Sequence, residues 1–302
     1  MNNGSVIVYM LRRFTLQLSI WTSFYFDLTP ADALLRFANL GLKNLELSAE
    51  HGEAATRGDD WRIQLAYLRD LCDKNGIKLW QMHAPLNLDV ADTDPDKRGR
   101  DIDTAIKWIE YSHELNIPHL VIHPGGNNGA KSEEEESSIF DLNLSAFQYL
   151  SEAADNFNVM LCIENMQEKN KEPRRLGAYI YDLNDLIDAV GADSLGICFD
   201  SSHANVTGLD LYHAIRECGK RLTATHISDN DGSGDQHRMP FNGNIDWSKV
   251  MSALKDIDYN CAFNLEIPGE SKSQKSSMLP IEVRDAKVTY AKRLFEYMTC
   301  SS

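Results

Sequence analysis

The stretch VMLCIEN (159–165) indicates the class of fold, because in it an apolar run is followed directly by a carboxylate. A short apolar run of this kind is consistent with a strand that is buried on both faces, as in a parallel sheet. Glu164 follows the run directly, and a buried carboxylate is costly unless it is paired or bound to a metal. We therefore predict a strand over 159–165, with Glu164 at a functional end of the sheet.

Similar apolar runs recur along the chain, and longer amphipathic segments separate them. The predicted strands cover 14–20, 44–48, 77–84, 119–124, 159–165, 195–200, 222–228 and 261–267. Helices are predicted near 30–40, 60–75, 96–116, 134–157, 182–190, 207–219, 246–256 and 279–298. Eight strand–helix units in strict alternation indicate a parallel sheet, and eight is the number that closes a (β/α)₈ barrel. We expect an α/β fold, a single-domain TIM barrel over 14–302, preceded by an N-terminal appendage over 1–13.

A doubly wound open sheet is the alternative arrangement of the same elements. It would require a glycine-rich, phosphate-binding turn after the first strand, and SIWTSFYFDLTP (19–30) is not such a turn. The length of 302 residues is also normal for one α/β barrel. The barrel is therefore the preferred arrangement.

The amino-acid composition indicates which kinds of binding partner the protein can have. The formal net charge is −15, which disfavours a nucleic-acid or anionic-membrane partner, because phosphate binding rests on clustered Lys and Arg. No uncharged apolar run is long enough to span a membrane. Cys162, Cys198 and Cys261 lie inside apolar runs, so we expect reduced core thiols and a cytoplasmic protein. A homo-oligomer is compatible with the sequence.

Polar residues end the predicted strands one after another, and in a barrel such positions share one mouth. Taken singly, DSSH (200–203) could be a helix cap and the loop HISDNDGSGDQHRMPFNGNID (226–246) could be an acidic solvated loop. Glu46 also lies near the end of its strand, whereas His51 is expected to face solvent. The combined set is harder to explain without cations, since imidazoles and carboxylates in one cleft suit Zn²⁺, Mn²⁺, Fe²⁺ or Co²⁺. The candidate metal ligands are His83, His123, Glu164, Asp200, His203, His226, Asp235, His237 and Glu266.

Eight short motifs lie at or near the predicted strand ends: MHAP (82–85), VIHPGG (121–126), CIEN (162–165), CFDSSHA (198–204), THISDNDG (225–232), DQH (235–237), GNIDW (243–247) and NLEIPG (264–269). Together they resemble the xylose isomerase-like TIM barrels, a family that includes ketose 3-epimerases, sugar isomerases and apurinic-site nucleases of the endonuclease IV type. The resemblance extends from about Phe14 to the last helix.

The resemblance implies a metal site whose size depends on the branch of the family. The epimerase branch implies one divalent ion, Zn²⁺ or Mn²⁺ with Co²⁺ or Mg²⁺ as alternatives. Its ligands would be Glu164, Asp200, His226 and Glu266, and the two Glu would also act as the acid/base pair. The endonuclease branch implies three zinc ions and adds His83, His123, His203, Asp235 and His237 as ligands. One to three ions are therefore expected.

The leading hypothesis is a sugar isomerase or epimerase that acts on a small carbohydrate by proton transfer through an enediolate. Trp21, Asn165 and Arg238 are expected to contact the substrate.

A zinc-dependent phosphodiesterase is the alternative, but the net charge and the acidic loop SAEHGEAATRGDDW (48–61) disfavour a DNA substrate. A barrel that only binds a sugar, and a lyase or dehydratase, are further alternatives. No obvious Lys/Arg cluster marks a phosphate site, since Arg174 and Arg175 are the only close basic pair in the loop after Glu164. We therefore expect an unphosphorylated substrate.

Overall fold

The computed structural model describes residues 16–169, 173–269 and 279–300. The appendage predicted over 1–13, and the start of the first predicted strand, lie outside the described residues. The remaining predicted strands and helices all fall at least in part within the described ranges.

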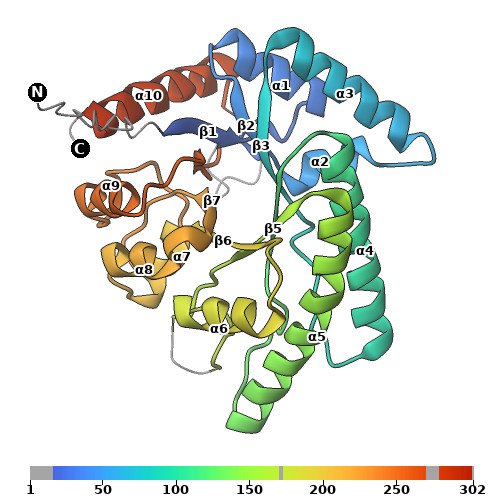
Figure 1. The fold of residues 1–302 in the computed structure, drawn as a ribbon. Helices are drawn as coiled ribbons and strands as arrows, with labels where there is room; N and C mark the ends of the chain where they lie inside the picture. Colours follow the sequence, from blue (N-terminus) through green and yellow to red (C-terminus); the bar gives the residue numbers. More distant parts are fainter. Residues whose placement is uncertain (1–15, 170–172, 270–278, 301–302) are drawn as a thin grey trace, which may run out of the picture.

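Eight parallel strands form one sheet that curls into a barrel, so the predicted TIM barrel is confirmed (Figure 1). The strands are β1 (Gln17–Trp21), β2 (Asn44–Leu47), β3 (Lys78–His83), β4 (His119–Ile122), β5 (Met160–Glu164), β6 (Leu195–Asp200), β7 (Leu222–His226) and β8 (Ala262–Leu265). The hydrogen-bonded order runs β7-β6-β5-β4-β3-β2-β1-β8. Ile227 closes the ring, because its N–H donates to Asn264 O at 2.8 Å and its carbonyl accepts from Glu266 N at 3.0 Å.

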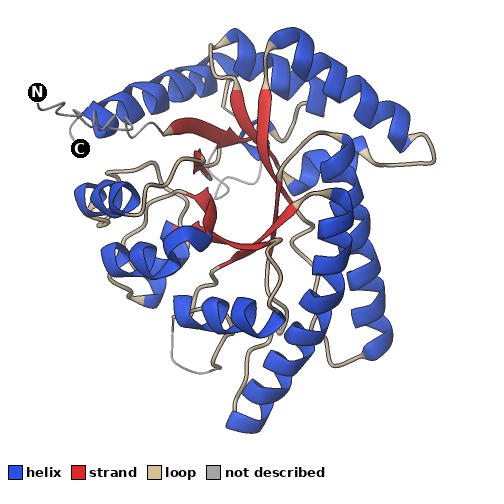
Figure 2. Ribbon diagram, in the orientation of Figure 1, coloured by secondary structure: helices blue, strands red, loops and turns tan. Residues whose placement is uncertain are grey.

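Helices surround the strands as an outer ring (Figure 2). They are α1 (Pro30–Asn39), α2 (Ala49–Ala55), α3 (Trp61–Asn75), α4 (Pro95–Glu114), α5 (Glu133–Phe157), α6 (Ile180–Val190), α7 (Ser201–Thr207), α8 (Leu211–Cys218), α9 (Trp247–Asp256) and α10 (Ile281–Cys300), with 3₁₀ turns η1 (Thr22–Tyr25) and η2 (Gly219–Arg221). The predicted helices agree with these bounds to within a few residues, apart from the one near 207–219, whose place is taken by α8 and η2. Two short helices, α2 and α7, were not predicted.

Local sequence fixes several helix starts. Thr29 caps α1 by accepting from Asp32 N at 3.2 Å, and Pro30 occupies the first helical position. Asp246 caps α9 through Ser248 N at 3.1 Å. Four glutamates, 133–136, fill the first turn of α5, where their negative charge interacts favourably with the positive end of the helix dipole.

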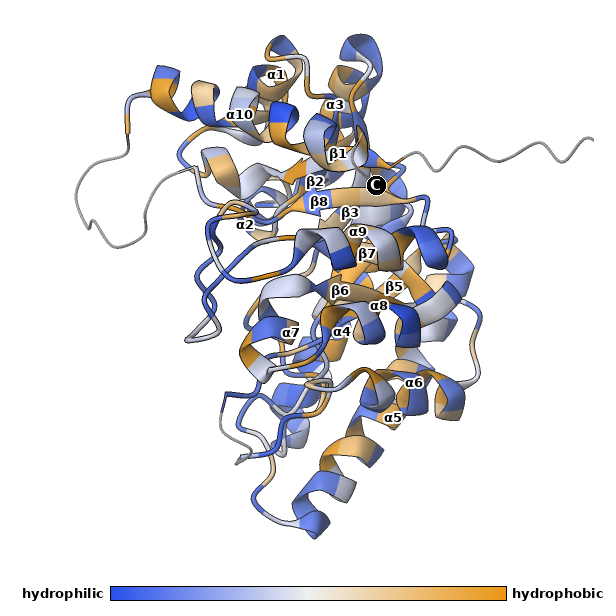
Figure 3. Ribbon diagram, turned by 90° about the vertical axis from the view of Figure 1, so that its left-hand side faces the viewer, coloured by the Kyte–Doolittle hydropathy of each residue, from blue (hydrophilic) through white to orange (hydrophobic). Residues whose placement is uncertain are grey.

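The buried apolar residues form one large cluster and a second, small one of Val121, Cys162, Cys198 and Ala224. Figure 3 shows the ribbon coloured by the hydropathy of each residue. His51 is 2% exposed within α2 and its Nε2 lies 3.1 Å from Leu28 O, so the expectation that it faces solvent is wrong. Cys162 and Cys198 are buried free thiols, and Cys261 is partly exposed. Within the described ranges, no helix has the length and apolarity needed to cross a membrane.

Candidate metal centre

Four predicted ligands meet at the carboxyl ends of β5 to β8. Glu164 ends β5, Asp200 ends β6, His226 ends β7 and Glu266 follows β8. Parallel register places Asp200 directly beside His226. One ligand atom from each of the four residues lies within 4.8 Å of those of the other three, and all four side chains are buried. These donors, three carboxylates and one imidazole, match the ligand preference of Zn²⁺ or Mn²⁺.

Asp200 uses only one of its carboxylate oxygens within the protein. Oδ1 caps α7 by accepting from His203 N at 2.7 Å. Oδ2 is buried and has no hydrogen-bond partner. Burial raises the pKa of Asp200 to about 8; the neighbouring Glu266 and Glu164 add to this shift, and His203 opposes it. A buried oxygen without a partner, surrounded by other metal-type donors, is the environment that a bound cation would satisfy, so these residues fit a divalent metal.

Glu164 lies at the centre of a group of imidazoles. Its Oε1 is 3.0 Å from His226 Nδ1, and its Oε2 is 3.2 Å from Nε2 of both His83 and His123. Burial alone would raise the pKa of Glu164, but these imidazoles hold it well below its ordinary value. Glu164 is therefore ionised. His83, Glu164 and His226 also form a second, overlapping group with ligand spacing.

The outer part of the centre comes from the loop after β7 and from α7. His237 Nε2 lies 2.8 Å from Asp235 Oδ2, and His203 Nε2 lies 3.6 Å from the same oxygen. Burial opposes charge on both imidazoles, but Asp200 and Asp235 raise the pKa of His203 to about 10, while Glu266 and Asp235 raise that of His237 to about 9. All nine predicted ligands are thus linked in one cluster.

The loop that follows β7 is a folded excursion rather than an open acidic loop. Asp229 and Arg238 exchange backbone hydrogen bonds at 2.8 and 2.9 Å, which folds the intervening segment back on itself. Asp229 Oδ2 also accepts from Trp247 Nε1 at 2.9 Å. Gly243 allows a close approach, because a Cβ there would lie 2.1 Å from Asn230 O. The fold of this loop brings Asp235 and His237 to the candidate metal centre.

The three residues expected to contact substrate have different surroundings. Trp21 stacks on His237 with ring centroids 5.9 Å apart, and its Nε1 donates to Ile267 O at 2.7 Å. Asn165 is fully buried and its side-chain amide bonds both backbone groups of Asp200, at 2.7 and 3.1 Å. In the structure Asn165 therefore positions Asp200. Arg238 is partly exposed and bonds Asp231 Oδ2 at 3.1 Å.

Glu46 is a buried carboxylate that the sequence placed near a strand end but did not assign to the site. It is 0% exposed, accepts from Gln81 Nε2 at 3.0 Å and also bonds Asn264 Nδ2. Its Oε2 lies 3.2 Å from His226 Nε2. Alternation along β2 was the available signal, since it gives Glu46 the same inward orientation as the other strand-end groups. Such an outer carboxylate orients a metal-binding imidazole.

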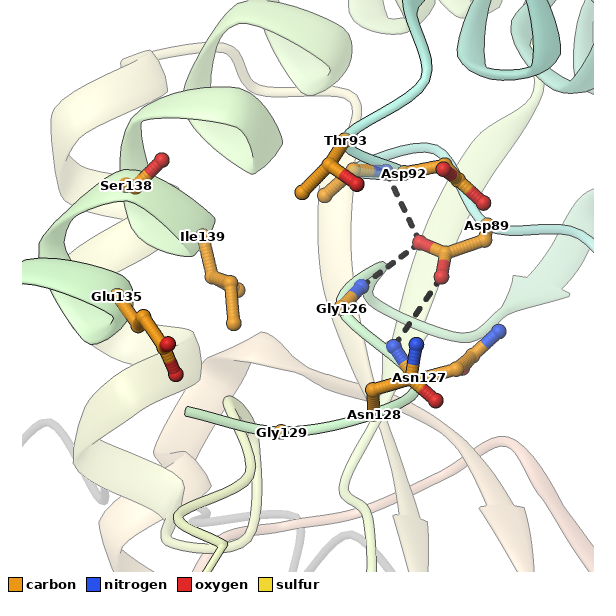
Figure 4. Close-up of a pocket in the computed structure, with 11 residues that line it drawn as sticks. Asp89, Asp92, Thr93, Gly126, Asn127, Asn128, Gly129, Glu135, Ser138 and Ile139 are labelled. Atoms are coloured by element: carbon orange, nitrogen blue, oxygen red, sulfur yellow. Dashed lines mark hydrogen bonds between the residues drawn. The ribbon is translucent and has the colours of Figure 1, made fainter. Parts of the chain in front are cut away.

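A separate polar cavity of about 210 Å³ lies between the loops after β3 and β4 and the start of α5 (Figure 4). Asp89 holds the two loops together. Its Oδ1 accepts from Gly126 N at 2.7 Å and Ala91 N at 3.2 Å, and its Oδ2 accepts from Asn127 N at 3.2 Å. These bonds fix the position of residues 126–129 beside the barrel mouth.

The chain belongs to the xylose isomerase-like TIM barrel family, whose sequence model matches residues 34–289. The predicted resemblance is therefore confirmed at the level of the family. The fold and the strand-end cluster are consistent with that membership.

Three comparisons illustrate the similarity. The chain is 28% identical over 161 residues to the uncharacterised protein y4fM of Sinorhizobium fredii, covering 53% of this chain and only 50% of that relative. It is 25% identical over 222 residues to a probable endonuclease 4 of Acholeplasma laidlawii, covering 66% and 69% of the two chains. The crystal structure of a D-psicose 3-epimerase in the presence of D-fructose superposes with a TM-score of 0.77 at 17% identity, covering 94% of this chain and 99% of that one. The last comparison shows a shared fold.

Proposed function

We propose that this protein is a divalent-metal-dependent isomerase or epimerase of a small carbohydrate. The observation that carries the proposal is the buried group of Glu164, Asp200, His226 and Glu266, in which Asp200 Oδ2 has no hydrogen-bond partner. The D-psicose 3-epimerase with the same fold adds support. We assign Zn²⁺ or Mn²⁺ as the cofactor from the mixed imidazole and carboxylate donors.

Proton transfer would use the two glutamates of this group. A bound divalent ion would acidify the C–H next to the substrate carbonyl and stabilise the enediolate. Glu164, a carboxylate that lies 3.0 Å from His226 Nδ1 in this group, would accept that proton, and Glu266 would return a proton to the opposite face. Two carboxylates in different surroundings can hold opposite protonation states, as this division of roles requires.

Residues around the cluster would orient the sugar. His203 and His237 would hydrogen-bond substrate oxygens or serve as further ligands. Trp21 stacks on His237 and would form an apolar wall beside it. Arg238 follows His237 in the same loop, so we propose that it contacts the sugar at the mouth of the barrel.

The proposal is tested by proton exchange with solvent. The metal-loaded protein would be incubated in D₂O with a panel of ketoses and aldoses, and NMR would follow deuterium incorporation next to the carbonyl. We expect incorporation and isomer formation with at least one sugar, and loss of both after chelation. Exchange that persists in chelator, or no exchange with any sugar under metal saturation, would contradict the proposal.

A zinc-dependent phosphodiesterase is the second candidate, because all nine predicted ligands lie in one cluster and one relative is a probable endonuclease 4. Elemental analysis of protein purified without chelator separates the two. About one metal ion per chain favours the isomerase or epimerase, whereas about three zinc ions favour the phosphodiesterase. Chelator-sensitive cleavage of abasic-site DNA would then decide for the second candidate.

A further inference from the structure

The two neighbouring arginines, Arg174 and Arg175, lie in different environments. Arg174 Nη2 lies 2.6 Å and 2.8 Å from the two carboxylate oxygens of Asp182, and its Nη1 lies 3.3 Å from Glu168 Oε2. Its Nε is 3.6 Å from Glu136. The charge of Arg174 is therefore used within the fold, where it ties the loop after β5 to α6.

Arg175 points to the other side of the same segment. Arg174 and Ala130 exchange backbone hydrogen bonds at 2.7 and 2.8 Å, so the loop after β5 runs beside the loop after β4. In extended backbone, consecutive side chains point to opposite sides. Arg175 accordingly faces Asn127, whose Oδ1 accepts from Arg175 Nη2 at 3.4 Å.

Arg175 has no carboxylate within ion-pair distance in the ranges that the structure describes, and the same holds for Lys169. Both residues line a cavity of about 240 Å³ together with Asn127, Asn128 and Gln167. Asn127 and Asn128 also line the cavity beside Asp89 (Figure 4), so the two cavities share these residues. Glu168 lines this second cavity as well, so the charged residues of its described lining are two positive, Lys169 and Arg175, and one negative.

This cavity is therefore positively charged in a protein whose net charge is −15. Arg175 is partly buried, and burial lowers its pKa while Glu164 and Asp89 oppose that shift. A partly buried guanidinium without a carboxylate partner is stabilised by an anionic ligand, which it can bind through two parallel N–H groups.

We propose that Arg175 and Lys169 bind an anionic group, a phosphate or a carboxylate, on the substrate. This inference rests on the proposed function for the identity of the rest of the ligand, a small carbohydrate. It revises the expectation of an unphosphorylated substrate, because the sequence could not show that only one arginine of the pair is neutralised inside the fold.

The test compares matched ligands on the metal-loaded full chain. Isothermal titration would measure Kd for D-fructose, D-fructose 6-phosphate and D-glucuronate with wild-type protein and with R175Q, K169Q and R293Q. Arg293 is an exposed arginine on α10, so R293Q removes one positive charge away from this cavity. Thermal melts would check that the variants fold, which we expect because, among the described residues, the Arg175 side chain makes one hydrogen bond, at 3.4 Å.

We expect one charged ligand to bind more tightly than D-fructose, and R175Q to weaken that binding roughly 10- to 100-fold while R293Q does not. The charged ligand whose Kd rises in R175Q identifies the bound group: D-fructose 6-phosphate would indicate a phosphate, and D-glucuronate would indicate a carboxylate. Equal Kd values for wild type and R175Q would place the anion on the metal instead and overturn the inference. Failure of both charged ligands to bind would overturn it too.

The two proposals fail in distinguishable ways. Charged-ligand binding that depends on Arg175, without proton exchange on any sugar, would leave the anion site standing and remove the isomerase. Proton exchange on a sugar, together with equal charged-ligand Kd values for wild type and R175Q, would keep the isomerase and remove the anion site.

Discussion

Glu46 Oε2 lies 3.2 Å from Nε2 of His226, on the side of the imidazole away from the candidate metal ligands. The other ring nitrogen, Nδ1, lies 3.0 Å from Glu164 and 3.6 Å from Glu266. A proton on Nε2 directed at Glu46 leaves the Nδ1 lone pair for a metal ion. Glu46 therefore positions a proposed ligand without being a ligand itself.

Replacement of this positioning carboxylate is expected to weaken metal binding. E46Q retains the shape of the side chain but removes the charge that holds the Nε2 proton, so metal affinity should fall by about tenfold or more. Titration with Co²⁺, followed by its visible absorption, measures the change in Kd and in coordination geometry. E152Q, a change on the exposed side of α5, is the control. An unchanged Co²⁺ titration in E46Q would assign Glu46 a purely structural role.

The two glutamates of the centre are expected to be required for turnover. E164Q should abolish deuterium exchange on the sugar that wild type processes, since its amide cannot accept the proton, and E266Q should abolish isomer formation, since its amide cannot return one. Both variants should keep the wild-type far-ultraviolet circular dichroism spectrum, because the substitution retains side-chain volume. Exchange retained in E164Q together with isomer formation retained in E266Q would refute the assignment of these residues as the acid/base pair.

Asp200 has separable roles as a helix cap and as a proposed ligand. In wild type, metal at about 100 times its Kd should add about 2.7 kcal/mol of stability, or roughly 4 °C in Tm. D200N keeps an oxygen that can cap α7, so we expect it to lose most of the metal-dependent rise while remaining close to wild type in chelator. D200A also lacks the cap and should lose about 1 kcal/mol more.

Differential scanning calorimetry with and without metal measures both effects. A metal-dependent rise of the same size in D200N and wild type would exclude Asp200 from the ligand set. Equal melting of D200N and D200A in chelator would show that the cap contributes little.

Arg174 and Arg175 are expected to differ in their effect on stability. R174Q removes the ion-pair partner of Asp182, which is 7% exposed. It should reduce the free energy of unfolding by about 2 kcal/mol. This loss is smaller than the loss expected when a fully buried ion pair is broken. R175Q should leave stability nearly unchanged, because its side chain has no ion pair in the described ranges. Urea unfolding of both variants measures the contrast. Similar losses in the two would show that Arg175 is also a structural residue.

The barrel could be predicted from the sequence because its signals are local. Apolar runs such as VMLCIEN, the alternation with amphipathic segments, and caps such as Thr29 before Pro30 each act within one or two turns of chain. The same local pattern placed the nine candidate ligands at strand ends or in the segments that follow them. The short helices α2 and α7 were missed because each is only two turns long and follows a strand directly, which leaves little periodicity to detect.

The sequence by itself determined the class of fold, the strand-end position of each polar side chain and the resemblance to a family of metal-dependent barrels. Only the tertiary structure decided how each side chain is used. It showed that Asp200 caps a helix with one oxygen and leaves the other without a partner, and that Arg174 is neutralised while Arg175 is not. The physical reason is that these uses depend on distances between different strands and loops, which barrel closure and register set and which no single segment encodes.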